Sequence, residues 1–188
     1  MSSRRYWILA CVLAMALGLA ACGRESHPEA ADANNNGGYV AAGPITYQLQ
    51  VSRQLNPYAT EDKQYLTGLP AGTTQPKPDG MWYAVFLQAK NQTDAAAKTT
   101  DTFDIVDTQG NKYYPLALNA SENPYAWQPM TLEPSAREPE ADTTASFGPT
   151  QGQLLLFKLP TQVYSNRPLT LQIHSPGQST PSSISLDL

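Results

Sequence analysis

Apolar and polar residues alternate with a period of two along much of the chain, which is the pattern of a strand with one buried and one solvated face. The clearest early example begins shortly after Pro44. Its apolar positions are Tyr47, Leu49, Val51 and Leu55. Arg53 interrupts this set, so we expect the strand to end or to bulge at that position. The segment predicts a strand with one face in a core.

Further strands are predicted downstream, and one of them differs in pattern. Residues 81–87 are apolar at every position, which is typical of a central strand covered on both faces. Residues 103–105 predict a short strand, and Gly110 permits a tight turn into residues 112–114 because glycine tolerates a positive φ. Runs nearer the C-terminus predict strands at residues 154–159, 169–173 and 184–188.

The rest of the pattern favours an all-β fold. No segment after residue 43 has a sustained 3.6-residue apolar period, and many of the 16 prolines lie between the predicted strands, where they would break helices. About seven to nine short strands separated by turn residues indicate an immunoglobulin-like β-sandwich. Residues 44–188 would form this single domain. The Cys–Trp–Cys core of antibody domains is absent from the sequence.

The N-terminus follows a different pattern, that of an export signal. Arg4 and Arg5 precede an apolar run at residues 8–19. Twelve helical residues span about 18 Å, which is too short for a hydrocarbon core of about 30 Å and disfavours a transmembrane helix. The paired arginines also match part of a twin-arginine signal, whereas the strongly apolar run favours the general secretory route. The sequence leaves both routes open.

The apolar run ends in the sequence LAAC at residues 19–22, which resembles the lipobox of bacterial lipoproteins. The resemblance implies that the signal peptide, residues 1–21, is removed and that Cys22 carries a lipid. It therefore implies a chain anchored in the cell membrane and facing outside the cytoplasm. Residues 22–43 contain few apolar side chains and predict a flexible tether.

Composition narrows the function classes further. The chain has two cysteines. Cys11 would leave with the signal peptide and Cys22 would carry the lipid, so the mature chain has no disulfide, thiol nucleophile or cysteine metal site. The formal net charge changes from −4 to −6 because Arg4 and Arg5 also leave. A mildly acidic chain gains nothing from phosphate backbones, so we expect no nucleic-acid partner.

The sequence contains no recognisable catalytic set. The two histidines are His27, in the predicted tether, and His174, on the outward face of a predicted strand, where we expect an exposed polar side chain. A serine hydrolase needs a histidine beside its nucleophile, and no G-x-S-x-G elbow is present. We therefore predict no catalytic residues and no enzymatic activity.

The acidic residues predict neither a metal site nor a cofactor. Asp101, Asp104 and Asp107 are spaced by three, which places neighbours on opposite faces of a strand. The glutamate that closes an EF-hand loop is missing. We expect Asp107 to accept hydrogen bonds from the backbone of its own turn. The acidic loop at residues 133–142 contains two prolines and predicts an ordinary solvated loop.

Aromatic residues in the predicted loops give the better indication of a binding site. Tyrosine and tryptophan present large rigid surfaces with a polar tip, which suits recognition. The candidate binding residues are Tyr58, Tyr65, Tyr125 and Trp127. They lie in two long segments, residues 56–80 and 119–127, and long ordered loops are often functional. The alternative is that these rings cover the open ends of the sandwich.

Several stretches of the chain resemble a known family. They are residues 82–86, Asn91-Gln92-Thr93, the strand from Phe103 into Asp107-x-x-Gly110-x-x-Tyr113, and residues 154–159. The pattern is similar to uncharacterised bacterial lipoprotein domains related to the telokin-like or immunoprotective extracellular proteins. This resemblance covers residues 45–175. It implies an immunoglobulin-like sandwich at the cell surface with no established enzymatic activity.

These features predict a lipid-anchored, non-enzymatic domain that binds another protein or an envelope glycan. The first alternative is a small-ligand or carbohydrate-binding module in which Tyr125 and Trp127 form a stacking platform. A second alternative, an envelope hydrolase, would require a buried titratable group beside His174 or within residues 133–142.

Overall fold

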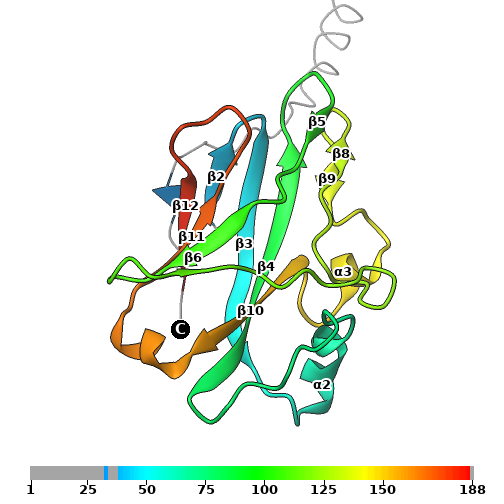
Figure 1. The fold of residues 1–188 in the computed structure, drawn as a ribbon. Coiled ribbons are helices and arrows are strands. Elements are labelled where there is room, and N and C mark those ends of the chain that lie inside the picture. The colour runs from blue at the N-terminus through cyan, green and yellow to red at the C-terminus, as the bar shows by residue number, and fades with distance from the viewer. Residues whose placement is uncertain (1–31, 34–37, 187–188) are drawn as a thin grey trace, which may run out of the picture.

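The computed structural model describes residues 32–33 and 38–186 (Figure 1). The predicted signal peptide, residues 1–21, and Cys22 lie outside the described residues. Two sheets face each other, and a two-stranded ribbon lies at one end of them. The ribbon consists of β5 (Ala97–Lys98) and β8 (Thr131–Leu132). The prediction of an all-β, immunoglobulin-like sandwich is confirmed.

The first sheet, called sheet A, is built on a long central strand. Its order is β10-β4-β3-β2, and β9 pairs with β4 beyond the end of β10. The strands are β2 (Tyr39–Ala42), β3 (Ile45–Leu55), β4 (Gly80–Asn91), β9 (Arg137–Glu138) and β10 (Gln153–Pro160). All of their pairings are antiparallel. Strand β4 therefore has hydrogen-bonded neighbours along both of its edges.

The second sheet, called sheet B, has the order β1-β12-β11-β6-β7. The strands are β1 (Asp32–Ala33), β6 (Phe103–Val106), β7 (Lys112–Tyr113), β11 (Leu169–Ile173) and β12 (Ser182–Leu186). Strand β1 runs parallel to β12, and the other pairs are antiparallel. The described residues contain twelve strands rather than seven to nine, because five of them are two residues long and too short to show a periodic pattern.

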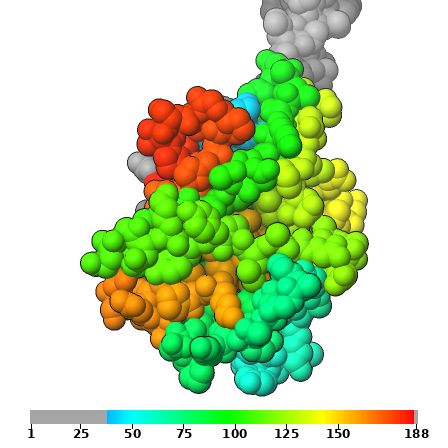
Figure 2. All heavy atoms as spheres, in the orientation of Figure 1, coloured from blue at the N-terminus to red at the C-terminus, as the bar shows by residue number. Residues whose placement is uncertain are grey.

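Short helical segments connect the strands of the described residues. They are α2 (Thr60–Lys63), η2 (Gln64–Leu66), α3 (Thr144–Phe147) and η3 (Thr161–Ser165). Helices α2 and α3 lie on the side of sheet A that faces away from sheet B (Figure 1). The segment before β4 contacts the end of β10, where the Lys158 ammonium donates to the Thr74 carbonyl at 2.9 Å. Figure 2 shows these two segments, in green and orange, touching at the lower end of the molecule.

The main core lies between the two sheets. Alternate residues of β4, from Met81 to Ala89, point into it and meet apolar residues of β6, β11 and β12. Tyr47, Phe103 and Trp127 form an aromatic cluster there, in which the Phe103 and Trp127 ring centroids are 5.3 Å apart in an edge-to-face arrangement. Burial of each such side chain stabilises the fold by roughly 1.5–3 kcal/mol. This layer holds the two sheets together.

A second, smaller core lies on the outer face of sheet A. Trp82 and Phe86 project from this face and are covered by Tyr65 and Tyr125 from the connecting segments. The Tyr65 ring centroid is 4.9 Å from that of Phe86 and 4.8 Å from that of Tyr125. The prediction that residues 81–87 form a strand buried on both faces is therefore confirmed.

A β-bulge in β3 gives the two halves of this strand different apolar faces. The register against β4 shifts between Leu49 and Val51. As a result, Leu49 points into the main core, whereas Val51 and Leu55 pack in the outer core. The expectation of a bulge or strand end at Arg53 is wrong in position. Arg53 is accommodated within the strand because its guanidinium binds the Asp62 carboxylate at 2.5 Å.

The sandwich begins before the predicted boundary at residue 44. Residues 39–42 form β2 rather than part of a tether, and Val40 and Ala42 are buried in the main core. The two residues of β1 pair with β12. These segments are too short and too poor in large apolar residues to show a strand pattern. Their conformation follows from pairing with neighbouring strands rather than from local propensity.

A buried carboxylate stabilises the turn between β6 and β7. Asp107 accepts hydrogen bonds from the backbone N–H groups of Gln109 and Asn111, so the expectation that it caps its own turn is confirmed. It also accepts one from the Tyr113 hydroxyl. Burial alone would raise the pKa of Asp107, but hydrogen bonds from Asn111, Asn166 and the turn outweigh it and hold the pKa below its usual range.

The fully buried side-chain amide of Asn91 stabilises the chain at the end of β4. The Asn91 side chain donates to the Ala95 and Leu132 carbonyls at 2.7 and 2.9 Å. It also accepts hydrogen bonds from the Thr93 N–H and hydroxyl. The backbone of Asn91 pairs with residues 135 and 136. One side chain thus connects β4 to the segment that leads into β9.

Replacing Asn91 with alanine is expected to lower the free energy of unfolding by about 2–4 kcal/mol, because several buried groups lose their partners together. Urea denaturation measures the change. Gln92→Ala removes a partly exposed amide at the next position and should cost less than about 1 kcal/mol. Equal destabilisation by the two substitutions would contradict the role assigned to Asn91.

Candidate functional site

Three of the four candidate binding residues are buried. The exposed fractions of Tyr65, Tyr125 and Trp127 are 1%, 4% and 8%, whereas Tyr58 is 88% exposed. A stacking platform of Tyr125 and Trp127 is therefore absent, and that part of the prediction is wrong. The rings fill the two cores because sheet A presents apolar residues on both of its faces.

Internal hydrogen bonds satisfy the polar tips of Tyr125 and Trp127, whereas the buried Tyr65 hydroxyl has no hydrogen-bond partner among the described residues. Trp127 Nε1 donates to the Thr100 carbonyl at 2.9 Å, and the Tyr125 hydroxyl donates to the Gln64 side-chain oxygen at 2.8 Å. A buried tyrosine or tryptophan normally requires such a partner. The polar tips of Trp127 and Tyr125 therefore serve the fold and are not directed at a ligand.

The two long segments that carry these residues form a cover for sheet A. The Asn123 amide donates to the Tyr65 and Thr67 carbonyls at 3.2 and 3.1 Å. This contact joins residues 56–80 to residues 119–127 over the outer core. The segments are long because they cover one half of a sheet face.

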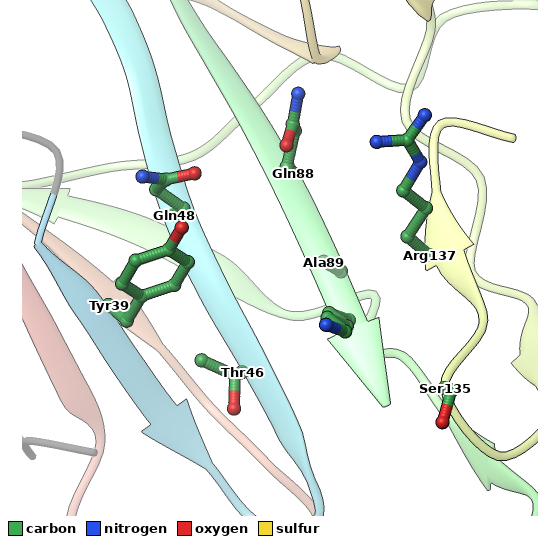
Figure 3. A pocket seen from close by; sticks show the side chains of 8 residues that line it. Tyr39, Thr46, Gln48, Gln88, Ala89, Ser135 and Arg137 are labelled. Carbon is green, nitrogen blue, oxygen red and sulfur yellow. The ribbon is translucent and has the colours of Figure 1, made fainter. Parts of the chain in front are cut away.

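The other half of this outer face is open and carries a polar hollow of about 240 Å³. Strands β2, β3 and β4 and the segment around β9 contribute its walls (Figure 3). Its polar lining, called the polar shelf, consists of Tyr39, Thr46, Gln48, Gln88, Lys90, Ser135 and Arg137. Figure 3 shows Tyr39 and Gln48 on neighbouring strands at one side, Gln88 in the middle and Arg137 at the other side.

The position of the polar shelf follows from the residue pattern of the strands. In β4 the continuous apolar run ends at Leu87, and Gln88 and Lys90 then face outward into the hollow. The alternate residues Ala89 and Asn91 remain buried. The polar positions of β3 that line the hollow precede the β-bulge. The outer sheet face is open where polar and apolar residues alternate in both β3 and β4. It is covered where β4 is apolar at every position.

Two cations lie opposite each other on the polar shelf. Lys90 and Arg137 are directly paired between β4 and β9, so their side chains leave the same face of the sheet. Like charges in such a pair destabilise a sheet. Within the described part of the chain, neither side chain has an ion-pair or hydrogen-bond partner, and no carboxylate lines the hollow. The polar shelf is therefore locally positive on a chain whose formal net charge is −4.

Hydrogen bonds hold part of the polar shelf in place. Gln50 Nε2 donates to Gln48 Oε1 at 2.9 Å, and Gln92 Nε2 donates to Thr46 Oγ1 at 2.8 Å. Side chains that are already ordered lose less conformational entropy when a ligand binds. This row along β3 is therefore partly preorganised for binding.

A buried carboxyl group lies on the other face of β9. Glu138 is 1% exposed, and neither of its carboxyl oxygens makes a well-formed hydrogen bond among the described residues. Burial raises the pKa of Glu138 to about 8, although the nearby Thr99 hydroxyl and Gln128 N–H act in the opposite direction. The group is therefore mainly protonated at neutral pH. It does not compensate the charges of Lys90 and Arg137.

His174 differs from the exposed polar side chain that the sequence predicts. Its Nε2 pairs with the buried Asp104 carboxylate, which also lies 3.3 Å from the Lys112 ammonium. A second hollow of about 340 Å³ lies beside His174. Its lining carries charges of both signs, from Lys98 and Asp101, and contains no tyrosine, tryptophan or phenylalanine. The polar shelf differs from it in having charge of one sign and a tyrosine ring.

Two observations concern metals and membranes. Within residues 38–186, no three or more histidine, cysteine, aspartate or glutamate side chains are grouped so that they could hold a metal ion. The described part of the chain also contains no helix with the length and apolar character needed to cross a bilayer.

No protein-family model and no curated protein matches the chain. Among solved structures, the yjhA protein of Bacillus subtilis aligns with a TM-score of 0.50 and 10% identity, over 86% of this chain and 100% of that one. At this identity the likeness shows the fold alone. It does not confirm the predicted relation to telokin-like or immunoprotective proteins.

Two other solved structures align with lower scores. The "putative lipoprotein (ycdA)" of Bacillus subtilis has a TM-score of 0.48 and 11% identity, over 80% of this chain and 38% of that one. An uncharacterised β-sandwich protein of Clostridium difficile has a TM-score of 0.44 and 10% identity, over 88% of this chain and 99% of that one.

The residues of the polar shelf are not predicted from the sequence, because they come from four strands and share no motif. One local signal is present in the sequence. After the apolar run at residues 81–87, polar residues stand at Gln88 and Lys90, on either side of Ala89. This change marks the point at which one face of the strand becomes open to solvent.

Replacing Glu138 with glutamine is expected to remove a pH dependence of stability. Because the pKa of Glu138 is raised, the folded state holds its proton more tightly than the unfolded chain does. The resulting stabilisation is complete below the ordinary pKa of 4.5 and is lost as the pH rises to about 8. Between these values the free energy of unfolding should fall by about 1.4 kcal/mol per pH unit.

Urea denaturation at pH 5, 6.5 and 8 measures this slope. Glu138→Gln should give nearly constant stability over this interval. Glu140→Gln, an exposed neighbour on the same segment, should keep the slope of the wild-type chain. A wild-type profile that is level from pH 5 to 8 would contradict the presence of a buried, protonated carboxyl group.

Proposed function

We propose that this chain is a lipid-anchored, non-enzymatic binding domain that faces outside the cytoplasm and binds through the polar shelf. The observation that carries the proposal is the cross-strand pair of Lys90 and Arg137, which lines a polar hollow without a compensating carboxylate. An arrangement that is unfavourable in the free sheet becomes favourable when a partner supplies the missing negative charge.

The anchor is part of the proposal and rests on the lipobox at residues 19–22. Ten positions separate Cys22 from Asp32 at the start of β1. A chain of this length reaches at most about 35 Å when extended. A lipid on Cys22 would therefore keep the domain close to the membrane and restrict its partners to the cell envelope.

The shape of the polar shelf favours a partner that lies across it. Its volume of about 240 Å³ is below the roughly 300–1,000 Å³ typical of pockets that enclose a whole small ligand. The hollow is also part of an open sheet face rather than a closed cavity. An envelope protein or glycan suits this geometry better than the alternative of an enclosed small molecule.

The hydrolase alternative is weaker. Two buried groups meet what this hypothesis requires, Asp104 beside His174 and Glu138 within residues 133–142. Acyl transfer also needs a nucleophile hydrogen-bonded to the histidine. Among the described residues, the hydrogen bond of the His174 ring is to Asp104. Asp104 also pairs with Lys112, which makes the group a structural ion network on the surface of sheet B.

Crosslinking on intact cells followed by affinity capture tests the proposed function. The wild-type chain is expected to capture a specific envelope component, and Cys22→Ala should lose most of it because the chain is no longer held at the membrane. Tyr39→Ala should reduce capture at least fivefold by removing the ring from the polar shelf.

Tyr114→Ala is the matched control, because it removes an exposed tyrosine outside the polar shelf. It should capture as much as the wild-type chain. Capture that is unchanged in Tyr39→Ala, with wild-type thermal stability, would show that the polar shelf is not the binding surface.

A further inference from the structure

We propose that the polar shelf recognises an acidic saccharide, in which a carboxylate or phosphate group accompanies sugar hydroxyl groups. This inference rests on the proposed function and specifies the ligand class of the same site. It is carried by three features that occur together on the shelf: paired cations, an aromatic ring and a row of neutral hydrogen-bonding side chains.

The cations define the position of the acidic group. Lys90 and Arg137 are directly opposite in an antiparallel ladder, a geometry in which the Cα atoms are about 4.5–5.5 Å apart. An anion located between the two side chains accepts hydrogen bonds from both and removes their mutual repulsion. The planar guanidinium of Arg137 matches the two oxygens of a carboxylate or phosphate.

The neutral part of the polar shelf defines the rest of the ligand. Gln88 offers an amide donor and an acceptor, the half-buried Gln48 is paired with it across the strands, and Ser135 adds a hydroxyl group. Such groups pair with sugar hydroxyls, which are donors and acceptors at once. Thr46 is 3% exposed and accepts a hydrogen bond from a neighbouring side chain, so it supports the row rather than facing a ligand. Tyr39 adds a flat apolar ring with a polar tip. An acidic peptide would engage the two cations but would leave most of this row unused.

The dimensions of the polar shelf fit a short stretch of saccharide. It crosses β2, β3, β4 and β9, three strand spacings or about 14 Å. Tyr39 lies at one side and Arg137 at the other (Figure 3). The acidic group and the ring that stacks on a sugar are therefore held at opposite ends of the strip.

The charge of the whole chain limits how acidic the ligand is. The formal net charge is −4, so a dense polyanion is repelled at long range while two cations attract it locally. A saccharide with isolated acidic groups satisfies both conditions. Its affinity should fall as salt is added, because the cations at the shelf are solvent-accessible.

Isothermal titration of the mature lipidated protein in a neutral detergent tests the inference. The probes are trigalacturonate, its methyl ester, galacturonate, glucose 6-phosphate and triglutamate. Trigalacturonate should bind at least tenfold more tightly than its neutral ester, since the ester keeps the hydroxyl groups but loses the charge. The relative affinities of galacturonate and its trimer distinguish a free sugar acid from a segment of a polymer, and glucose 6-phosphate tests the phosphate form.

A charge-matched pair of double variants provides the control. Lys90→Gln with Arg137→Gln should weaken trigalacturonate binding at least tenfold without loss of thermal stability, because the substitutions remove a repulsive pair. Lys63→Gln with Lys77→Gln removes the same charge from two exposed sites outside the polar shelf and should bind as the wild-type chain does.

Equal affinity for trigalacturonate and its ester, or tighter binding of triglutamate, would overturn the ligand class. This result is distinguishable from failure of the proposed function. If capture on cells depends on Tyr39 but no acidic saccharide binds, the polar shelf remains a binding surface and the ligand class is wrong. If neither is observed, both proposals fail.

Discussion

The architecture depends on the burial of β4 on both of its faces. Residues 81–87 are apolar at every position, so neither face of this strand can remain in water without exposing large side chains. Sheet B covers one face. Residues 56–80 and 119–127 cover the other, over Trp82 and Phe86. Removing either cover would expose several fully buried side chains, each worth roughly 1.5–3 kcal/mol, which is a large share of the stability of a domain.

The cover of the outer face ends where the pattern of both central strands changes. The bulge of β3 lies between Leu49 and Val51, which are paired with Leu87 and Phe86 of β4. On one side of this level the outer positions are apolar and covered. On the other side, from Gln88 onward, they are polar, and most of them are half-buried. The bulge in β3 therefore brings the outer residues on each side of it level with outer residues of the same kind in β4. The polar half of this sheet face is left open.

The parts of the structure that the sequence predicts are those with a local pattern. The doubly buried strand at residues 81–87 and the Asp107 turn are determined by nearby residues. The fate of Tyr65, Tyr125 and Trp127 is not, because an aromatic residue with a polar tip suits a surface and a core equally well. For Tyr125 and Trp127, only the tertiary positions of Gln64 and Thr100, which accept their hydrogen bonds, distinguish the two outcomes.

The polar shelf lies beyond sequence prediction for a different reason. Its members extend from Tyr39 to Arg137 along the chain and meet through strand register, which no local pattern encodes. Strands β2 and β9 contain four and two residues, and such short segments adopt strand geometry because longer neighbours pair with them. The same dependence explains why the predicted tether extended too far, to residue 43.

The wall of the polar shelf is held by Asn91, the last residue of β4, which is not among the candidate site residues predicted from the sequence. Asn91 pairs through its backbone with residues 135 and 136, and its side chain binds the Leu132 carbonyl. These contacts fix the segment immediately before β9. Because β9 has only two residues, they also determine that Arg137 lies opposite Lys90. The buried Asn91 amide therefore sets the separation of Lys90 and Arg137. The same residue stabilises the end of β4 and positions the cations of the candidate binding surface.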